Sequence, residues 1–265
     1  MSIDRMIDLK RYSMDRLDNA AGKALLARCK ADLAERGMFN LEGLVRSDAL
    51  KLAVKELRPV IDTKAFVHER SHNIYFKKEI PGLAPDHPAL KQVTTVNHTI
   101  CADQMRKDAV VLQIYEWPAL AAFLAAVMGK PVLHTMPDPL ARVNVMEYRA
   151  GEALNWHFDR SEFTTTLLLQ APEEGGAFEY RTDLRSESDP NYEGVAKLLE
   201  GRDPQVKLQQ VAAGTLNVFR GRNTAHRVTP VKGARERIIA VFSYYERPGV
   251  MFSAEERIGF YGRAG

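Results

Sequence analysis

Apolar residues recur at helical spacing in the first part of the chain and in short extended runs in the second part. Within residues 15–36 an apolar side chain returns every three or four positions, at Leu17, Leu25, Leu26, Cys29 and Leu33. This spacing predicts an amphipathic helix, and Gly37 is the residue type that ends one. The residues that follow, 38–45, are predicted to form a short strand.

Two further segments of the first part carry helix signals at their ends. Ser47 and Asp48 offer an N-cap to a helix over residues 49–60. Residues 116–129 have a proline in the first turn and a glycine at the end, where a helix tolerates them best. The sequence therefore predicts mostly helical structure over residues 1–140.

From about residue 141 the pattern changes to short runs rich in β-branched and aromatic residues. Glycine and proline interrupt these runs about every ten residues, and one helix-like segment lies at residues 191–201. Such a series predicts a mainly β fold: a jelly roll (double-stranded β-helix, cupin-like) braced by the α-helices of the N-terminal region. We expect one domain over residues 1–265, with the jelly-roll core at 141–250 and a C-terminal tail at 251–265.

The composition argues against several classes of partner. The 265 residues carry a net charge of +3 with both signs mixed along the chain, which offers no basic face for nucleic acid. No stretch approaches the roughly 18 apolar residues of a membrane-spanning helix, so no membrane partner is expected. Two cysteines are too few for a disulfide framework, which favours a cytoplasmic protein. The oligomeric state stays open between a monomer and a homodimer.

His157 and Asp159 lie two residues apart in the stretch LNWHFDRSEF, residues 154–163. Side chains alternate along a strand, so this pair points to one face, while Trp156 and Phe158 point to the other and pack in the core. Most His-x-Asp triplets are accidental surface or capping pairs. The pair therefore gains meaning only from residues elsewhere in the chain.

A second histidine, His226, completes a set of two imidazoles and one carboxylate. Three protein ligands on one face of an octahedral metal leave three positions open, which is typical of non-haem Fe(II) oxygenases. The sequence thus predicts His157, Asp159 and His226 as the metal ligands and the catalytic centre. A zinc hydrolase could use the same three ligands, but it would need a general base nearby.

Arg237 begins the predicted strand RIIAVFSYY, in which Ser243 shares its face. A guanidinium is the natural partner of a carboxylate in a partly desolvated pocket because its donors match both oxygens. Arg237 is therefore the candidate for binding the distal carboxylate of 2-oxoglutarate, with help from Tyr148 or Ser243. The alternative is a solvated charge at the strand edge, as expected for Arg235.

Three segments resemble motifs of one enzyme family, in the order in which that family carries them. YRAGEALNWHFD (148–159), EGGAFEY (174–180) and GTLNVFRGRNTAHRVTPVKGARER (214–237) resemble motifs of the prolyl-4-hydroxylase-like Fe(II)/2-oxoglutarate dioxygenases. The flanking RSHNIYF (70–76) and FSAEERIGFYGR (252–263) resemble the BesD/HalD family of free amino-acid halogenases and hydroxylases. The resemblance implies an enzyme that binds Fe(II) and 2-oxoglutarate, uses O2, and releases succinate and CO2.

Asp159 separates this chain from the halogenating members of that family. Those members carry glycine at this position, and the missing carboxylate opens a coordination position for chloride. The resemblance therefore implies hydroxylation of an unactivated C–H bond in a free amino acid. L-Lysine is the first expectation for the substrate, followed by ornithine, arginine and aliphatic amino acids. Halogenation or desaturation with the same cofactors, or a cupin-like binding protein without turnover, are the alternatives.

Residues that recognise the substrate are expected outside the set of metal ligands. A free amino acid needs a cation for its carboxylate and acidic or carbonyl groups for its amines. Arg70, His72 and Asn73 in the RSHN stretch, and His134 in PVLHTMPDP, are the candidates. The alternative for each is a hydrogen-bonded residue that fixes the helical region to the β core.

Overall fold

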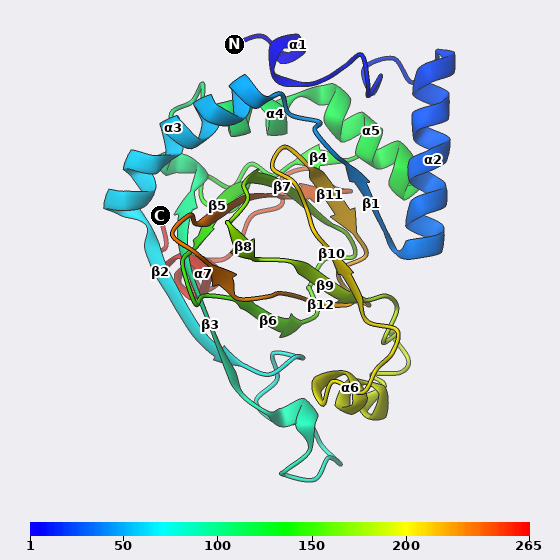
Figure 1. The fold of residues 1–265 in the computed structure, drawn as a ribbon, viewed down its shortest axis with the longest axis vertical. Coiled ribbons are helices and arrows are strands. Elements are labelled where there is room, and N and C mark those ends of the chain that lie inside the picture. Colours follow the sequence, from blue (N-terminus) through cyan, green and yellow to red (C-terminus); the bar gives the residue numbers. More distant parts are fainter.

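Two antiparallel sheets face each other in the computed structural model, which describes residues 1–265 (Figure 1). The major sheet has seven strands, in the order β1 (Met38–Leu41), β11 (Leu216–Phe219), β7 (Thr164–Gln170), β14 (Arg237–Phe242), β5 (Val143–Tyr148), β3 (Val93–Cys101) and β2 (Phe66–His72). The minor sheet has four, in the order β10 (Lys207–Gln209), β9 (Phe178–Arg181), β12 (Ala225–Val228) and β6 (Leu154–His157). Two short ribbons pair β13 (Val231–Lys232) with β8 (Glu174–Gly175) and β15 (Tyr244–Tyr245) with β4 (His134–Thr135).

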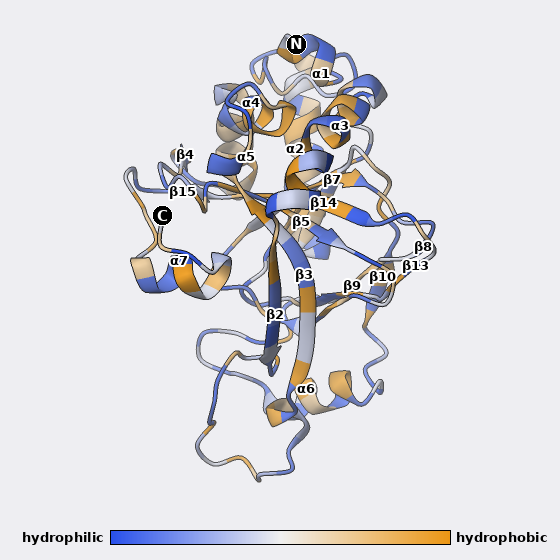
Figure 2. Cartoon of the chain, turned by 90° about the vertical axis from the view of Figure 1, so that its left-hand side faces the viewer, coloured by the Kyte–Doolittle hydropathy of each residue, from blue (hydrophilic) through white to orange (hydrophobic).

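Helices cover the face of the major sheet that is turned away from the minor sheet (Figure 1). These helices are α2 (Ala20–Arg36), α3 (Ser47–Lys64), α4 (Val110–Glu116) and α5 (Pro118–Met128), with α1 (Ile3–Met6) packed on α3 and α4. Two helices lie elsewhere: α6 (Tyr192–Leu199) packs with Trp156 and Phe158, and α7 (Ala254–Tyr261) lies beside β2 and β3. The largest apolar core lies between α2–α5 and this face, and Figure 2 shows apolar residues gathered there. Ile238 and Ala240 on β14 belong to this core, so Arg237 and Ile239 point to the opposite face, toward the minor sheet.

A second apolar cluster joins the inner faces of the two sheets. Met38 and Phe219 from the major sheet pack with Phe178, Tyr180 and Val228 from the minor sheet. Two facing antiparallel sheets with a helical layer on one of them confirm the predicted jelly roll braced by helices.

The predicted helices are present, with differences at their ends. α2 begins at Ala20, where the Asn19 side chain accepts a hydrogen bond from the Gly22 N–H, and Gly37 ends it at a φ of 72°. The predicted N-cap of α3 is wrong by one position, because the capping residue is Arg46 and no side chain caps the helix.

The third predicted helix, 116–129, corresponds to α5, and α4, which the sequence did not predict, precedes it; the two meet at Trp117. The residue before a proline is pushed toward extended backbone, and Trp117 has φ −69° and ψ 116°. Taken singly, no helix has the length and apolar character to cross a membrane; only α4 and α5 counted together do, with a 55° bend between them.

The N-terminal region also contributes two strands, β2 and β3, where the sequence predicts mostly helical structure. They pair over residues 66–72 and 93–99 and extend the major sheet beyond β5. β2 lies at the edge of the sheet and most of its side chains are exposed, so its sequence lacks an apolar alternation. That missing pattern explains why the strand escaped prediction.

Candidate metal centre

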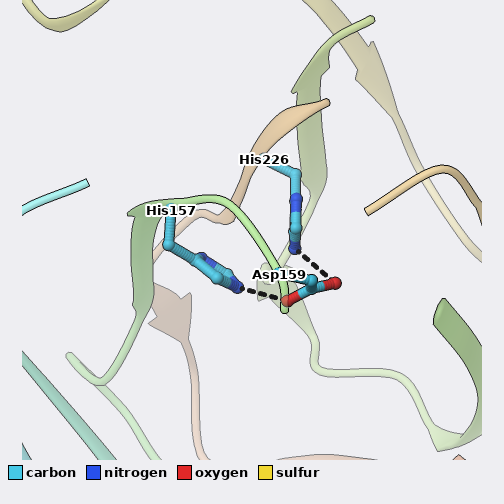
Figure 3. A group of neighbouring side chains, drawn as sticks. All are labelled: His157, Asp159 and His226. Atoms are coloured by element: carbon cyan, nitrogen blue, oxygen red, sulfur yellow. Dashed lines mark ion pairs between the residues drawn. The ribbon is translucent and has the colours of Figure 1, made fainter. Parts of the chain in front are cut away.

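The minor sheet places the two predicted histidine ligands directly opposite each other. β6 and β12 are antiparallel neighbours, and His157 pairs in register with His226. Both side chains are buried, and their ring centroids lie 4.1 Å apart. Asp159 lies two residues beyond His157, just after the end of β6, and its carboxylate points toward both rings (Figure 3).

The nitrogen and oxygen atoms of these three side chains converge on one small volume. His157 Nε2 lies 3.4 Å from Asp159 Oδ1, and His226 Nε2 lies 3.4 Å from Asp159 Oδ2. Neighbouring ligands on an octahedral metal with bonds of ~2.1 Å are roughly 3 Å apart, so the three side chains fit one ion. The structure brings together the three residues that the sequence predicts as ligands.

Backbone carbonyls determine which nitrogen of each histidine faces the carboxylate. His157 Nδ1 lies 2.8 Å from the Asn155 carbonyl, and His226 Nδ1 lies 2.9 Å from the Thr224 carbonyl. A carbonyl only accepts hydrogen bonds, so Nδ1 carries the proton in both rings and Nε2 keeps its lone pair. A metal ligand needs such a lone pair, and the outer hydrogen bonds hold each ring in orientation.

Asp159 is held in place by contacts of its own. Its N–H donates to the Gly221 carbonyl at 3.0 Å, and the Thr164 hydroxyl donates to its Oδ2. A side chain at position 221 would collide with the Asp159 carboxylate and with Thr164, so this close approach requires glycine. Sequence reasoning missed Thr164 and Gly221 because neither is a metal-ligand residue type.

Burial and the neighbouring rings act in opposite directions on the Asp159 carboxyl. Burial alone would raise its pKa, but the adjacent rings of His226 and His157 outweigh burial and hold the pKa well below its usual range. Burial, together with the nearby His226, lowers the pKa of His157. The carboxylate is therefore an anion and His157 is neutral near neutral pH, as metal ligation requires.

Trp156 and Phe158 point away from the ligands, as the alternation along the strand predicts. Both are buried in a separate apolar cluster that includes Val195 and Leu198 of α6. Packing of these two rings against α6 fixes the segment from which His157 and Asp159 project to the other side.

Arg237 is buried at the start of β14 and has no acidic partner. Its side chain lies opposite Tyr148, with Cζ 5.9 Å from the ring centroid, and its Nε has no hydrogen-bond partner. Only 4% of Arg237 is exposed, and burial lowers the pKa of the guanidinium to about 10. A buried cation without a counter-charge calls for an anionic ligand, and a carboxylate matches its donors. Arg237 is therefore not a solvated charge at the edge of the strand, which was the alternative interpretation. Arg235, by contrast, is exposed, as expected.

The Gly-Gly-x-Phe segment contacts both Arg237 and the histidines. Gly176 has a φ of 59°, and a side chain there would press against Arg237 Cδ at 3.1 Å. Two residues later, the Phe178 ring lies 5.8 Å from the His226 ring, and Phe219 lies 4.7 Å from it. Three separate motifs of the sequence thus meet around one centre.

The two residues predicted to assist Arg237 lie in different places. Tyr148 is buried beside Arg237, burial raises the pKa of its phenol to about 12, and its hydroxyl has only the Met146 sulfur, at 3.8 Å, as a partner. Ser243 lies six residues beyond Arg237, about 20 Å along an extended strand. Its hydroxyl donates to the Ala141 carbonyl at 2.9 Å. The structure therefore brings Tyr148 to Arg237 but not Ser243.

His72 is a predicted substrate residue that lies beside a metal ligand. Its ring centroid is 6.5 Å from that of His157, and its Nε2 lies 3.0 Å from Thr95 Oγ1. Phe76 stacks on His72 at 4.5 Å and lies 5.9 Å from His157. With φ at 54°, Phe76 adopts a backbone conformation that is unusual for a bulky residue and typical of functional segments. Phe76 was missed because no local signal in the sequence marks such a conformation.

The other candidate substrate residues are dispersed. Arg70 on β2 lies over the Phe76 ring, with Cζ 4.9 Å from its centroid. The Asn73 side chain accepts hydrogen bonds from the Tyr75 and Lys77 N–H groups, at 3.2 and 3.1 Å, which is the structural alternative considered for it. His134 lies on β4, in a ribbon outside both main sheets, and is not brought to the ligands.

One family model matches most of the chain. It is that of the halogenase D family, and the match covers residues 21–251. The curated proteins contain no match. The chain belongs to the halogenase D family and is an enzyme, as the sequence resemblance predicts.

Several solved structures share the fold at low sequence identity. An oxidoreductase of the 2OG-Fe(II) oxygenase family from Burkholderia pseudomallei is 15% identical and covers 85% of this chain and 92% of its own, with a TM-score of 0.52. HygX from Streptomyces hygroscopicus, solved with nickel, 2-oxoglutarate and hygromycin B, is 13% identical, with coverages of 82% and 86% and a TM-score of 0.55. A prolyl hydroxylase from Trichoplax adhaerens is 11% identical, with coverages of 86% and 94% and a TM-score of 0.53. These likenesses concern the fold, and they agree with the predicted jelly roll.

Proposed function

We propose that this enzyme is an Fe(II)/2-oxoglutarate-dependent hydroxylase that oxidises an unactivated C–H bond of a free amino acid. Fe(II) and 2-oxoglutarate are its cofactors, and O2 is the co-substrate. One oxygen atom of O2 enters the hydroxylated product and the other enters succinate, while the carboxylate next to the keto group leaves as CO2. HygX, which shares the fold, is solved with nickel and 2-oxoglutarate bound, which supports this cofactor pair.

The observation that carries the proposal is a complete ligand triad combined with an unpaired buried arginine. His157, Asp159 and His226 direct their ligand atoms into one volume, and Arg237 lacks the counter-charge that a distal carboxylate would supply. A zinc hydrolase would use the triad but leave Arg237 without a role. A binding protein without turnover gives no reason for a triad that leaves metal positions open.

Asp159 favours hydroxylation over halogenation within this family. A carboxylate in the third ligand position occupies the place that a halide would need. Hydrogen bonding to Thr164 and the space left by Gly221 support this carboxylate, so it is a built part of the centre.

The residues of the chain act by ligation and orientation. When bound, iron and 2-oxoglutarate supply the activation of O2 and the oxidation of the C–H bond. His157, His226 and Asp159 would hold the metal, the histidines through Nε2, and Arg237 would orient the cosubstrate through its distal carboxylate. Phe76 lies edge-on to the His157 ring, with the ring centroids 5.9 Å apart.

The test incubates the iron-loaded protein aerobically with 2-oxoglutarate and each proteinogenic amino acid, plus ornithine, with and without chloride. We expect one product heavier by one oxygen atom, formed in equal amount with succinate and independently of chloride. A chlorinated product would establish halogenation, and a product lacking two hydrogen atoms would establish desaturation. Absence of succinate with every amino acid would favour the binding protein.

The family resemblance is the support for a free amino acid as substrate, with L-lysine as the first expectation from the sequence. A cytoplasmic location also stays a prediction from the sequence, and the oligomeric state stays open between a monomer and a homodimer.

A further inference from the structure

Arg185 is a partly buried cation to which the proposed mechanism gives no role. Its Cζ lies 4.0 Å from the ring centroid of Phe158, the residue between two of the metal ligands. Its Nε donates to the carbonyl of residue 222 at 2.7 Å, and its N–H donates to that of residue 223 at 3.4 Å. In the same loop, the Gly221 carbonyl accepts a hydrogen bond from the Asp159 N–H. Arg185 is therefore hydrogen-bonded to the segment that supports a metal ligand.

The terminal nitrogens of Arg185 have no partner in the protein. Its only side-chain hydrogen bond runs through Nε, and no carboxylate forms an ion pair with it. Burial lowers the pKa of Arg185, and an arginine stays charged at neutral pH. Arg185 therefore presents a positive charge without an ion-pair partner on the Phe158 ring, next to the loop that holds Asp159.

Arg70 presents a second unpaired guanidinium, from the end of β2. It lies over the Phe76 ring at 4.9 Å, and Phe76 in turn contacts the His157 ring at 5.9 Å. No carboxylate pairs with Arg70, and its position depends on Phe76, whose positive φ turns the chain back toward His72. Two arginines, the partly buried Arg185 and the exposed Arg70, thus lie on rings that flank His157: Phe158 follows it in the chain, and Phe76 lies beside its ring.

The acidic side chains on the segments that border the centre are already engaged, apart from the ligand Asp159. These segments are 70–77, 155–164, 183–189 and 219–226. Their acids pair as follows: Glu162 with Lys130, Asp183 with Arg220, Glu187 with Arg222, and Asp189 with the Asn191 N–H. Within these segments the charges without an ion-pair partner, other than the ligand Asp159 and the N–H-bonded Asp189, are positive; the unpaired Glu69 of β2 points to the other face of the strand from Arg70.

We propose that the substrate is anionic: an α-amino dicarboxylic acid of the aspartate and glutamate type, whose two carboxylates bind Arg185 and Arg70. This inference rests on the proposed function and departs from the expectation of lysine. A guanidinium binds a carboxylate through two parallel hydrogen bonds. The side-chain ammonium of lysine would instead meet like charges and no free carboxylate. Arg237 is assigned to 2-oxoglutarate because it is more deeply buried than the other two arginines.

The first arm of the test measures substrate binding without turnover. L-Aspartate, L-glutamate, L-lysine and L-ornithine are titrated by calorimetry into protein loaded with Ni(II) and 2-oxoglutarate. We expect one dicarboxylate to bind at least about tenfold more tightly than either basic amino acid, as one charge-assisted pair provides. Tighter binding of lysine or ornithine than of both dicarboxylates would overturn the inference.

The second arm removes each charge separately with Arg185→Gln and Arg70→Gln. Each variant should raise the Kd and KM of the dicarboxylate roughly 10–100-fold, with kcat and the Kd of 2-oxoglutarate close to wild type. Arg202→Gln, at an exposed position after α6, is the matched control and should change neither. Unchanged dicarboxylate affinity in both site variants would overturn the roles of these arginines.

The same titrations separate this inference from the proposed function. Binding of 2-oxoglutarate that needs Ni(II) and is lost in Arg237→Gln supports the proposed function whatever the substrate. Absence of that binding would remove the proposed function and the inference together. Intact 2-oxoglutarate binding with lysine as the tightest amino acid would remove the inference alone.

Discussion

Strands β5 and β14 carry buried charges to both faces of the major sheet, and the two faces treat them differently. Glu147 of β5 and Glu236, just before β14, face α3, whereas the residue after each of them, Tyr148 and Arg237, faces the minor sheet. Successive side chains alternate, so the two environments lie one residue apart. On the outer face, arginine side chains neutralise the buried charge of Glu147. On the inner face, no acidic side chain pairs with Arg237.

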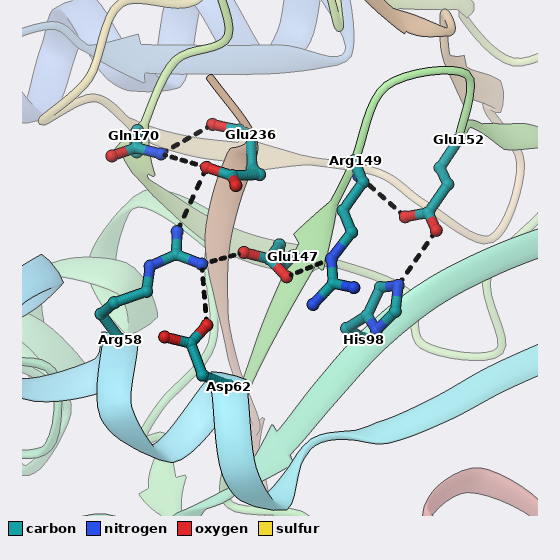
Figure 4. Close-up of polar contacts among 8 residues, drawn as sticks. All are labelled: Arg58, Asp62, His98, Glu147, Arg149, Glu152, Gln170 and Glu236. Atoms are coloured by element: carbon teal, nitrogen blue, oxygen red, sulfur yellow. Dashed lines mark hydrogen bonds and ion pairs between the residues drawn. The ribbon is translucent and has the colours of Figure 1, made fainter. Parts of the chain in front are cut away.

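On the outer face Glu147 is completely buried and doubly paired (Figure 4). Arg58 of α3 and Arg149 both donate to its carboxylate, Arg149 at 3.0 Å. Arg58 also lies 3.3 Å from carboxylate oxygens of Asp62 and Glu236. This network holds α3 on the sheet and leaves no charge for a ligand.

On the inner face the buried guanidinium of Arg237 has no such partners. Its Nε is unpaired, and the hydroxyl of Tyr148, whose ring lies near the guanidinium, contacts a sulfur atom. A protein rarely leaves a buried charge unpaired without a reason. We therefore interpret the paired Glu147 as part of a structural network and the unpaired Arg237 as part of a ligand site.

The largest effect should come from removing a metal ligand on the inner side. His226→Ala removes one of the three metal ligands and leaves two. Loss of an outer hydrogen-bond partner of a ligand costs up to roughly 100-fold, so loss of the ligand itself should lower Ni(II) affinity and turnover by more than that. Calorimetry with Ni(II) and assay of succinate measure the change. His87→Ala, on the loop between β2 and β3, is the control and should behave as wild type; metal affinity retained in His226→Ala would remove the triad from the account.

Breaking the outer network should destabilise the fold and spare the ligand site. Glu147→Ala leaves Arg58 and Arg149 without their buried partner and should lower the free energy of unfolding by about 3–5 kcal/mol in urea titrations. Glu236→Ala, at a partly exposed carboxylate, should cost less than about 1 kcal/mol. A loss for Glu147→Ala as small as that for Glu236→Ala would show that the network does not hold α3.

Removing the inner charge should produce the reverse pattern. Arg237→Met should weaken 2-oxoglutarate binding roughly 100-fold by loss of a charge-assisted pair. The free energy of unfolding without ligands should stay level or rise, because an unpaired buried charge is gone. Arg235→Met is the matched control and should change neither the affinity for 2-oxoglutarate nor the free energy of unfolding. Strong destabilisation by Arg237→Met would instead indicate that Arg237 has a structural role.

The smallest effect should come from the support of Asp159. Thr164→Val removes the hydroxyl that donates to the carboxylate and should lower Ni(II) affinity roughly tenfold. Excess metal should restore turnover, since the ligands are intact. Thr94→Val, at an exposed strand position, controls for the loss of a hydroxyl; equal metal affinity in both variants would show that Thr164 does not position Asp159.

Local sequence patterns were sufficient to predict much of the metal centre. The alternation of a strand predicts that His157 and Asp159 share a face while Trp156 and Phe158 pack elsewhere, and the structure agrees. The β-rich second half and the helix that Gly37 ends follow from residue patterns for the same reason.

Other features depend on contacts between distant segments, which no local pattern encodes. Examples are the register that places His157 opposite His226, the lack of a hydrogen-bond partner at Arg237 Nε, and the positive φ of Phe76. Ser243 lies just beyond the end of β14, and the spacing of about 3.3 Å per residue along a strand could already have excluded it as a partner of Arg237.

The most direct test of the central claim is calorimetric titration of 2-oxoglutarate into the wild-type protein with and without Ni(II), and into Ni(II)-loaded Arg237→Met. Binding should require both the metal and Arg237, with affinity falling roughly 100-fold when the arginine is absent. Equal affinity in all three samples would contradict the account, because neither the triad nor the unpaired arginine would then contribute to the site.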